Sequence, residues 1–138
     1  MKTKKLLLTA AALLLAAFAA SAQTVQVPNR KNLVIKEWTT AVGSTSKVLD
    51  HVTTYNADGR KIEEIEYYSN SRMKWRRRYE YAPDGKVSRE LLYDGKNRLN
   101  TVRRYEYNEL DQRKTQYNYD GKGKLRSVKV FEYISEDA

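Results

Sequence analysis

Tyrosine recurs along this chain at a fixed spacing, and that spacing limits the possible folds more than any other feature of the sequence. Tyr55, Tyr81, Tyr107 and Tyr133 follow one another at intervals of 26 residues. Four more rows keep the same step: Tyr67, Tyr93 and Tyr119; Tyr79, Tyr105 and Phe131; Glu80, Glu106 and Glu132; Met73, Leu99 and Leu125. Five rows in step indicate a chain built from copies of one structural unit.

Each unit contains two turn signals. The first is Asn56-Ala57-Asp58-Gly59 and its copy Ala82-Pro83-Asp84-Gly85, in which Asp-Gly supplies a residue with positive φ. The third copy, Asn108-Glu109-Leu110-Asp111, lacks the glycine, so either Asp111 takes the left-handed conformation or the loop differs. The second signal is a short hairpin loop at 68–71, 94–97 and 120–123, where Asn97 and Gly123 suit a left-handed residue.

The segments between the turns alternate with a period of two, which predicts half-buried strands. Because the loops are short, consecutive strands are expected to pair antiparallel. The predicted fold is all-β: an antiparallel meander of about eight strands in a single twisted or curled sheet, with two strands in each 26-residue repeat. The strands are expected at 32–41, 47–56, 60–68, 72–82, 86–94, 98–108, 112–120 and 124–134. The first two match the repeat only in part, because Thr53 stands where other copies have an aromatic residue.

Residues 1–22 have the layout of a signal peptide. Lys2, Lys4 and Lys5 precede an apolar run, and the segment ends in the small residues Ala20-Ser21-Ala22. A membrane anchor is the alternative, but the run falls short of the roughly 20 residues that span a bilayer. We expect cleavage after Ala22, an extended leader at 23–31, a β-repeat domain at 32–138, and a secreted or periplasmic location. The chain has no cysteine, so a lipobox anchor is excluded.

The basic charge narrows the possible partners. The net charge is +9 over 138 residues, and loss of the three lysines in residues 1–22 leaves +6 on 116 residues. A basic balance raises the question of nucleic acid, but export removes most nucleic acid from reach. A glycan, an anionic envelope polymer or an acidic protein is the favoured counterpart, and no transmembrane anchor is expected after cleavage.

The recurring Tyr-x-Tyr followed by Asp-Gly-Arg or Asp-Gly-Lys resembles the YD repeats of Rhs and teneurin proteins. The resemblance covers roughly residues 47–134 and implies repeated β-hairpins. The ending Ala20-Ser21-Ala22-Gln23 resembles signal peptides of Bacteroidota, in which glutamine commonly follows the cut. The layout as a whole resembles short secreted Bacteroides-type proteins of unknown function.

Alternation also predicts which side chains share a face, with odd-numbered strand residues on one side of the sheet. That face is expected to be aromatic, and its members are Leu49, Tyr55, Ile65, Tyr67, Trp75, Tyr79, Tyr81, Leu91, Tyr93, Leu99, Tyr105, Tyr107, Tyr117, Tyr119, Leu125, Phe131 and Tyr133. The opposite face is expected to be charged, with Glu64, Arg76, Arg78, Glu80, Glu90, Arg104, Glu106, Lys114, Arg126 and Glu132, interrupted by Val52, Val102, Val128 and Val130.

The aromatic face has two interpretations. Its tyrosines can be the core, or they can form a surface on which sugar rings stack. A row at one repeat phase, His51, Arg77, Arg103 and Lys129, lies within it. These cations either rest over neighbouring rings or form a stripe for an anionic ligand. The candidate ligand face comprises Trp75, Tyr79, Tyr81, Tyr105, Tyr107, Tyr133, Arg77, Arg103 and Lys129.

Catalysis is disfavoured by the residue types present. The chain has one histidine, His51, and no cysteine, so the usual nucleophile pairs and zinc ligand sets are lacking. Glu63, Glu64 and Glu66 could supply the two carboxylates of a glycosidase, but on alternating strand positions they are expected to be ordinary charges on both faces. We therefore expect no enzyme, cofactor, metal or catalytic residue. Two functions stay open: a binding module for a glycan or anionic surface polymer, and a structural module that pairs with a protein partner or a second copy through its sheet face or edge.

Overall fold

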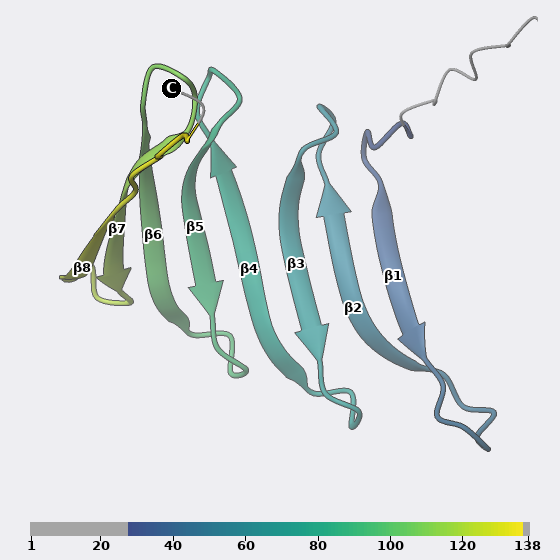
Figure 1. The fold of residues 1–138 in the computed structure, drawn as a ribbon. Helices are drawn as coiled ribbons and strands as arrows, with labels where there is room; N and C mark the ends of the chain where they lie inside the picture. Colours follow the sequence, from purple (N-terminus) through teal and green to yellow (C-terminus); the bar gives the residue numbers. More distant parts are fainter. Residues whose placement is uncertain (1–27, 137–138) are drawn as a thin grey trace, which may run out of the picture.

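The protein folds into one antiparallel sheet of eight strands in sequence order (Figure 1). The computed structural model describes residues 28–136; the signal peptide predicted at 1–22 and part of the leader predicted at 23–31 lie outside this range. The strands are β1 (Val34–Thr39), β2 (Val48–Tyr55), β3 (Lys61–Tyr67), β4 (Met73–Tyr81), β5 (Val87–Tyr93), β6 (Leu99–Tyr107), β7 (Arg113–Asp120) and β8 (Leu125–Val130). The all-β meander is confirmed, and the largest difference in bounds is β8, which was expected to reach residue 134.

The six loops from β2 to β8 share one conformation. In each, the fourth residue has positive φ and its N–H donates to the carbonyl of the first, as Gly85 does to Ala82 over 2.9 Å. In four of the loops the first residue is Asn or Asp, whose side-chain oxygen accepts two further backbone N–H groups; Asn56, for example, accepts from Asp58 and Arg60. Turn chemistry written in the sequence therefore sets the spacing of the strands.

Asp111 takes the left-handed conformation, with φ of 61° and its N–H donating to the carbonyl of Asn108 over 3.1 Å. The third copy thus keeps the common loop without the glycine, at the cost of placing a Cβ where glycine avoids steric strain. Lys86 pairs with the Asp111 carboxylate at 2.9 Å. This ion pair links the loop to the equivalent loop one repeat earlier, at 82–85.

Asp111→Gly is expected to raise the free energy of unfolding by about 0.5–1 kcal/mol, because glycine relieves the left-handed strain. Urea denaturation of the variant beside the wild type measures this difference. Asp111→Ala is the matched control, because it loses the same ion pair while keeping the Cβ. A glycine variant no more stable than the alanine variant would contradict the expectation.

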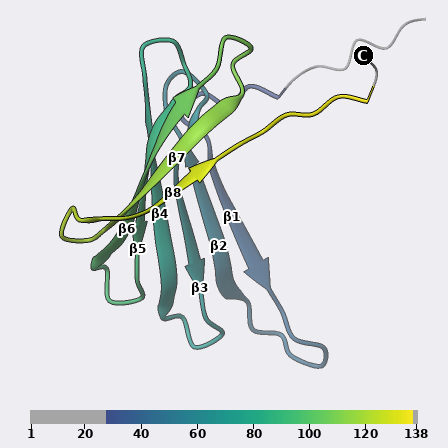
Figure 2. The same ribbon diagram turned by 60° about the vertical axis from the view of Figure 1, so that its left-hand side comes forward.

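Every strand pair contains one register shift, at a repeating position. In the pair of β4 and β5 it falls between Glu80 and Tyr81, and in the pair of β6 and β7 between Glu106 and Tyr107. Bulges of this kind increase the local right-handed twist of a sheet. The strands accordingly turn along the sheet, and β8 runs obliquely to β1 (Figure 2).

The expectation that odd-numbered strand residues share one face is wrong. From β2 onward, the regular part of each strand pair joins an odd-numbered residue to an even-numbered one, such as Arg77 to Leu92 and Arg103 to Glu90. Directly opposed side chains lie on the same face, so the odd and even positions exchange faces at every strand. Residues expected beside Tyr79 that instead lie on the other face are Leu49, Ile65, Tyr67, Leu91, Tyr93, Leu99, Tyr117, Tyr119 and Leu125.

Both faces therefore mix aromatic and charged side chains. We call one the Glu90 face, defined by His51, Glu64, Arg77, Tyr79, Glu90 and Arg103, which the pairing places side by side. The other is the Glu80 face, defined by Arg76, Arg78, Glu80, Arg89 and Arg104. The predicted division into an aromatic and a charged face fails because the pairing register, which fixes the faces, is not visible in a single strand.

The sheet is a single layer. Within residues 28–136 the backbone of each strand contacts only the neighbouring strands of the sheet, and Tyr105, 7% exposed, is the one large apolar side chain that is buried. A sheet normally packs a face against a second layer. Here the strands are held by backbone pairing, by ring contacts and by ion pairs. Most of the ion pairs join neighbouring strands, but that of Glu90 with Arg113 reaches from β5 to β7 across β6.

Candidate functional site

The candidate ligand residues lie on one side of the sheet, the Glu90 face. β4 supplies Trp75, Arg77, Tyr79 and Tyr81, and β6 supplies Arg103, Tyr105 and Tyr107. Lys129 follows on β8, opposite Gln116. Tyr133 lies beyond the end of β8, and its hydroxyl donates to the carbonyl of Arg113 over 2.7 Å. These residues share a face because they come from the even-numbered strands β4, β6 and β8 and the segment that follows β8. Their binding of a ligand stays a prediction.

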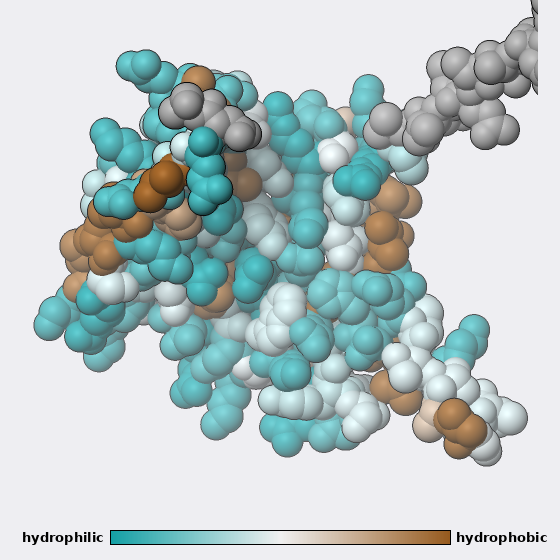
Figure 3. Space-filling view, viewed as in Figure 1, coloured by the Kyte–Doolittle hydropathy of each residue, from teal (hydrophilic) through white to brown (hydrophobic). Residues whose placement is uncertain are grey.

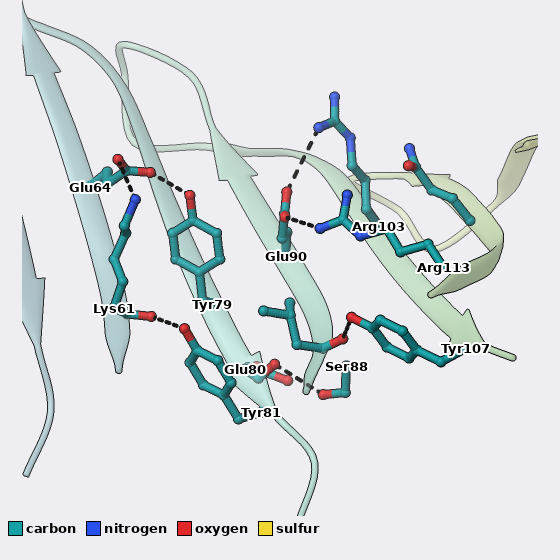
Figure 4. A network of polar contacts seen from close by, with 12 residues as sticks. Lys61, Glu64, Tyr79, Glu80, Tyr81, Ser88, Glu90, Arg103, Tyr107 and Arg113 are labelled. Atoms are coloured by element: carbon teal, nitrogen blue, oxygen red, sulfur yellow. Dashed lines mark hydrogen bonds and ion pairs between the residues drawn. The ribbon is translucent and has the colours of Figure 1, made fainter. Parts of the chain in front are cut away.

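Glu90 lies at the centre of this face and is 5% exposed. Its carboxylate lies 3.7 Å from Arg103 and 3.6 Å from Arg113 (Figure 4). The Arg113 guanidinium also covers the ring of Tyr105 at 4.0 Å from the centroid. The sequence analysis had assigned Glu90 to the solvated charged face. Pairing within the hairpin, which opposes position 90 to position 103, was the signal that could have found it.

A second polar cluster on the same face surrounds Glu64. Tyr79 donates its hydroxyl proton to Glu64, and Lys61 Nζ lies 3.1 Å from the same carboxylate (Figure 4). Burial favours the neutral acid, but the hydrogen bonds from Tyr79 and Lys61 outweigh it and lower the pKa of Glu64. Burial, followed by the bond to Glu64, raises the pKa of Tyr79 from 10.0 to about 12. The hydroxyl therefore acts as a donor over the whole physiological range.

Tyr79 is expected to ionise later than an ordinary tyrosine, and Tyr79→Phe should remove this late step from the tyrosinate absorbance curve. Because the folded-state pKa is raised, the stability it supplies is complete below about pH 10 and is lost as the pH rises through about 12. We expect the loss to be about 1 kcal/mol, after allowance for the solvent-exposed part of the ring. Denaturant unfolding at both pH values measures it.

Glu64→Gln is the companion variant, because it removes the negative charge beside the phenol while keeping a side chain of the same size. The pKa of Tyr79 is then expected to fall toward its ordinary value. The tyrosine that ionises at the highest pH could instead titrate identically in the wild type, Tyr79→Phe and Glu64→Gln. That result would show that the Tyr79 hydroxyl and the Glu64 carboxylate are not coupled.

Hydrogen bonds from tyrosine hydroxyls give a structural reason for the 26-residue spacing of Tyr81, Tyr107 and Tyr133. Tyr81 donates to the carbonyl of Lys61 and Tyr107 to that of Val87, each over 2.6 Å (Figure 4). Tyr133 makes the same bond to Arg113. Each bond runs from the end of one strand to the start of the strand before it and closes the open end of a hairpin. Sequence reasoning missed this structural role, although the constant spacing of the tyrosines was its signal.

The ring faces of this surface are occupied by cations of the same chain. Arg60 lies over Tyr81, Lys86 over Tyr107, and Arg77 over Trp75 at 5.4 Å from the ring centroid. His51 meets Trp75 edge-on, with ring centroids 5.8 Å apart. The sequence left two interpretations of the cationic row: cations over neighbouring rings, or a stripe for an anionic ligand. The first describes Arg77, over Trp75, and Lys129, over Phe131. Arg103 is instead held by Glu90.

The two edges of the sheet are its most open apolar surfaces. All six residues of β1 and all six of β8 are exposed. Val34 and Trp38 on β1 are 49% and 53% exposed, and Val130 on β8 is 68% exposed. In the space-filling view, apolar side chains gather over β8 on the left and β1 on the right (Figure 3). Unpaired edges that carry apolar residues can add another strand.

Residues 28–136 contain no group of three or more His, Asp or Glu side chains placed to hold a metal ion. No helix in this range has the length and apolar character to cross a membrane.

Comparisons with known proteins give a distant likeness among solved structures only. The chain matches no protein-family profile, and no curated protein sequence matches it. Among solved structures, a chain in the crystal structure of accessory secretory protein 1,2 and 3 in Streptococcus pneumoniae is similar at 12% identity, with a TM-score of 0.36. The likeness covers 81% of this chain and 19% of that chain. It is too weak to support an argument about fold or function.

Proposed function

We propose that this protein is an exported, non-catalytic interaction module that recruits a β-strand from another chain onto the open edges of its sheet. The observation that carries the proposal is the single layer: within residues 28–136 no second element covers the sheet, and both edge strands are exposed along their whole length. Strand addition satisfies the unpaired backbone groups of such an edge and covers apolar side chains beside it.

A library of strand-length peptides selected on the immobilised chain tests this proposal. Peptides that alternate apolar and polar residues are expected to bind, and Val130→Lys or Trp38→Lys is expected to abolish binding at its own edge, because lysine blocks strand addition. Leu110→Lys is the matched control, since Leu110 is 77% exposed in the loop between β6 and β7 and not on an edge strand. Strand addition would be refuted if no peptide were selected, or if the selected peptides bound Val130→Lys and Trp38→Lys as well as they bind the wild type.

A glycan or anionic surface polymer on the Glu90 face is the second candidate. The observation that favours it is Arg77, whose Nε is buried and has no hydrogen-bond partner among the described residues. Arg77 lies against Trp75, so a sugar at this point could meet both an aromatic ring and a charged donor. Glycan-array binding that is lost in Arg77→Ala, but kept in the edge variants, would support this candidate over strand addition.

A further inference from the structure

The repeat shows that β8 lacks a neighbour that equivalent strands possess. β4 and β6 both end in Tyr-Glu-Tyr, and the following strand pairs with this ending: Glu80 lies opposite Arg89, and Glu106 opposite Thr115. In the last copy the equivalent residues are Phe131-Glu132-Tyr133, which follow β8 and pair with no later strand of the sheet. The outer edge formed by β8 and residues 131–133 is therefore shaped to receive one more strand.

β1 has the sequence pattern expected of a strand that would pair with the outer edge of β8. In β3 and β5 a glutamate lies opposite a basic residue of the next strand, Glu64 opposite Arg77 and Glu90 opposite Arg103. β1 repeats this arrangement with Glu37 opposite His51. Its direction also fits, because antiparallel alternation requires the strand beyond β8 to run as β1, β3, β5 and β7 do.

The register of such a strand follows from the other copies. Thr53 lies opposite Glu64 and Tyr79 opposite Glu90, so Phe131 is expected opposite Glu37. The neighbouring positions then place Glu132 opposite Lys36 and Val130 opposite Trp38. The first of these pairs joins opposite charges, and the second covers two exposed apolar side chains.

We propose that a second copy of this chain adds its β1 to the β8 edge of the first, antiparallel and head-to-tail, with Glu132 opposite Lys36 of the second copy. This inference rests on the proposed strand addition and names its partner. Because two different surfaces meet, each added copy leaves one β1 edge and one β8 edge free. The assembly grows by repetition of one contact and continues the meander from chain to chain.

Cysteine cross-linking tests the register, since the natural chain has no cysteine to interfere. A Lys36→Cys chain is mixed with a Glu132→Cys chain under mild oxidation. Directly opposed residues of an antiparallel pair have Cβ atoms close enough for a disulfide, so the mixed dimer is expected to dominate over both self-dimers. Arg126→Cys, at the far end of β8, is the matched control and is expected not to cross-link with Lys36→Cys.

Sedimentation velocity gives an independent measurement. The wild-type chain is expected to gain mass with concentration. Glu132→Lys should weaken association roughly two- to fivefold, the range of a cross-strand charge pair. Adding Lys36→Glu to the same chain should restore it.

The outcomes separate the two proposals. Dominant self-dimers of Lys36→Cys would overturn the head-to-tail register while leaving edge pairing intact. A chain that stays monomeric at all concentrations, yet binds strand peptides at Val130, would overturn the second copy as the partner but not strand addition. A wild-type chain that neither self-associates nor binds strand peptides would refute both the second copy as partner and strand addition itself.

Discussion

Glu90→Ala is expected to lower the free energy of unfolding by about 2 kcal/mol. The carboxylate is the most buried charge among the described residues and holds Arg103 and Arg113 at 3.7 and 3.6 Å. Removing one member of a buried ion pair costs about 3–5 kcal/mol when the partner charge is left without solvent. Both arginines here are partly exposed and can reach water, so we expect a smaller loss. Urea denaturation followed by circular dichroism measures it.

Two variants make this result specific. Glu80→Ala removes an exposed pair with Arg89, 2.8 Å apart, and is expected to cost at most about 1 kcal/mol. Glu90→Gln should fall between them, because the next repeat already carries an amide, Gln116, opposite Lys129 at the equivalent position. A Glu90→Ala variant as stable as Glu80→Ala would show that the buried carboxylate does not hold β5, β6 and β7 together.

Gly121→Ala is expected to destabilise the fold by about 2 kcal/mol, within the range for overpacking. A Cβ at this position would overlap the backbone carbonyl oxygen of Leu99, which cannot move without disturbing the start of β6. Gly95 has the same relation to the carbonyl of Met73 one repeat earlier, at 2.8 Å. The glycine is therefore required by the close approach of neighbouring hairpin ends. Thermal and urea unfolding of the variant test this requirement.

Gly123→Ala in the same loop is the control. Gly123 has φ of 85° and nothing within 4 Å of its Cβ position, so alanine there costs only the backbone strain of the left-handed region, about 1 kcal/mol. If Gly123→Ala proved more damaging than Gly121→Ala, backbone conformation rather than close approach would limit this loop.

The sequence was sufficient for the strands because two independent signals agreed. Turn residues recur every 13 positions or so, and the alternation between them leaves room for one strand. The positive φ values of Asn97 and Gly123 followed from the same turn chemistry, whereas for Asp111 the sequence left a different loop open as the alternative. The end of β8 was misplaced because a strand needs a neighbour. Residues Phe131 to Tyr133 have the strand pattern of the earlier copies, but among residues 28–136 no later strand pairs with them.

The faces and the polar clusters could not be derived in the same way. Whether Glu90 lies beside Arg103 or on the opposite side from it depends on the pairing register, and a shift of one residue moves every side chain to the other face. The hydroxyl bonds of Tyr81 and Tyr107 depend on the bulge at each strand end, which no single residue type announces. The faces and the hydroxyl bonds can be read from the repeat only once the pairing of two neighbouring strands is known.

The confinement of backbone contacts to adjacent strands has a consequence for how the molecule unfolds. Stability in such an array is approximately a sum over hairpins and the junctions between them, as in solenoid repeats. Unfolding can then begin at β1 or β8 and advance inward one hairpin at a time, while the centre around Glu90 stays intact. The terminal hairpins fray first because each has a neighbour on one side only, and a strand docked at either end would protect the molecule from unravelling there.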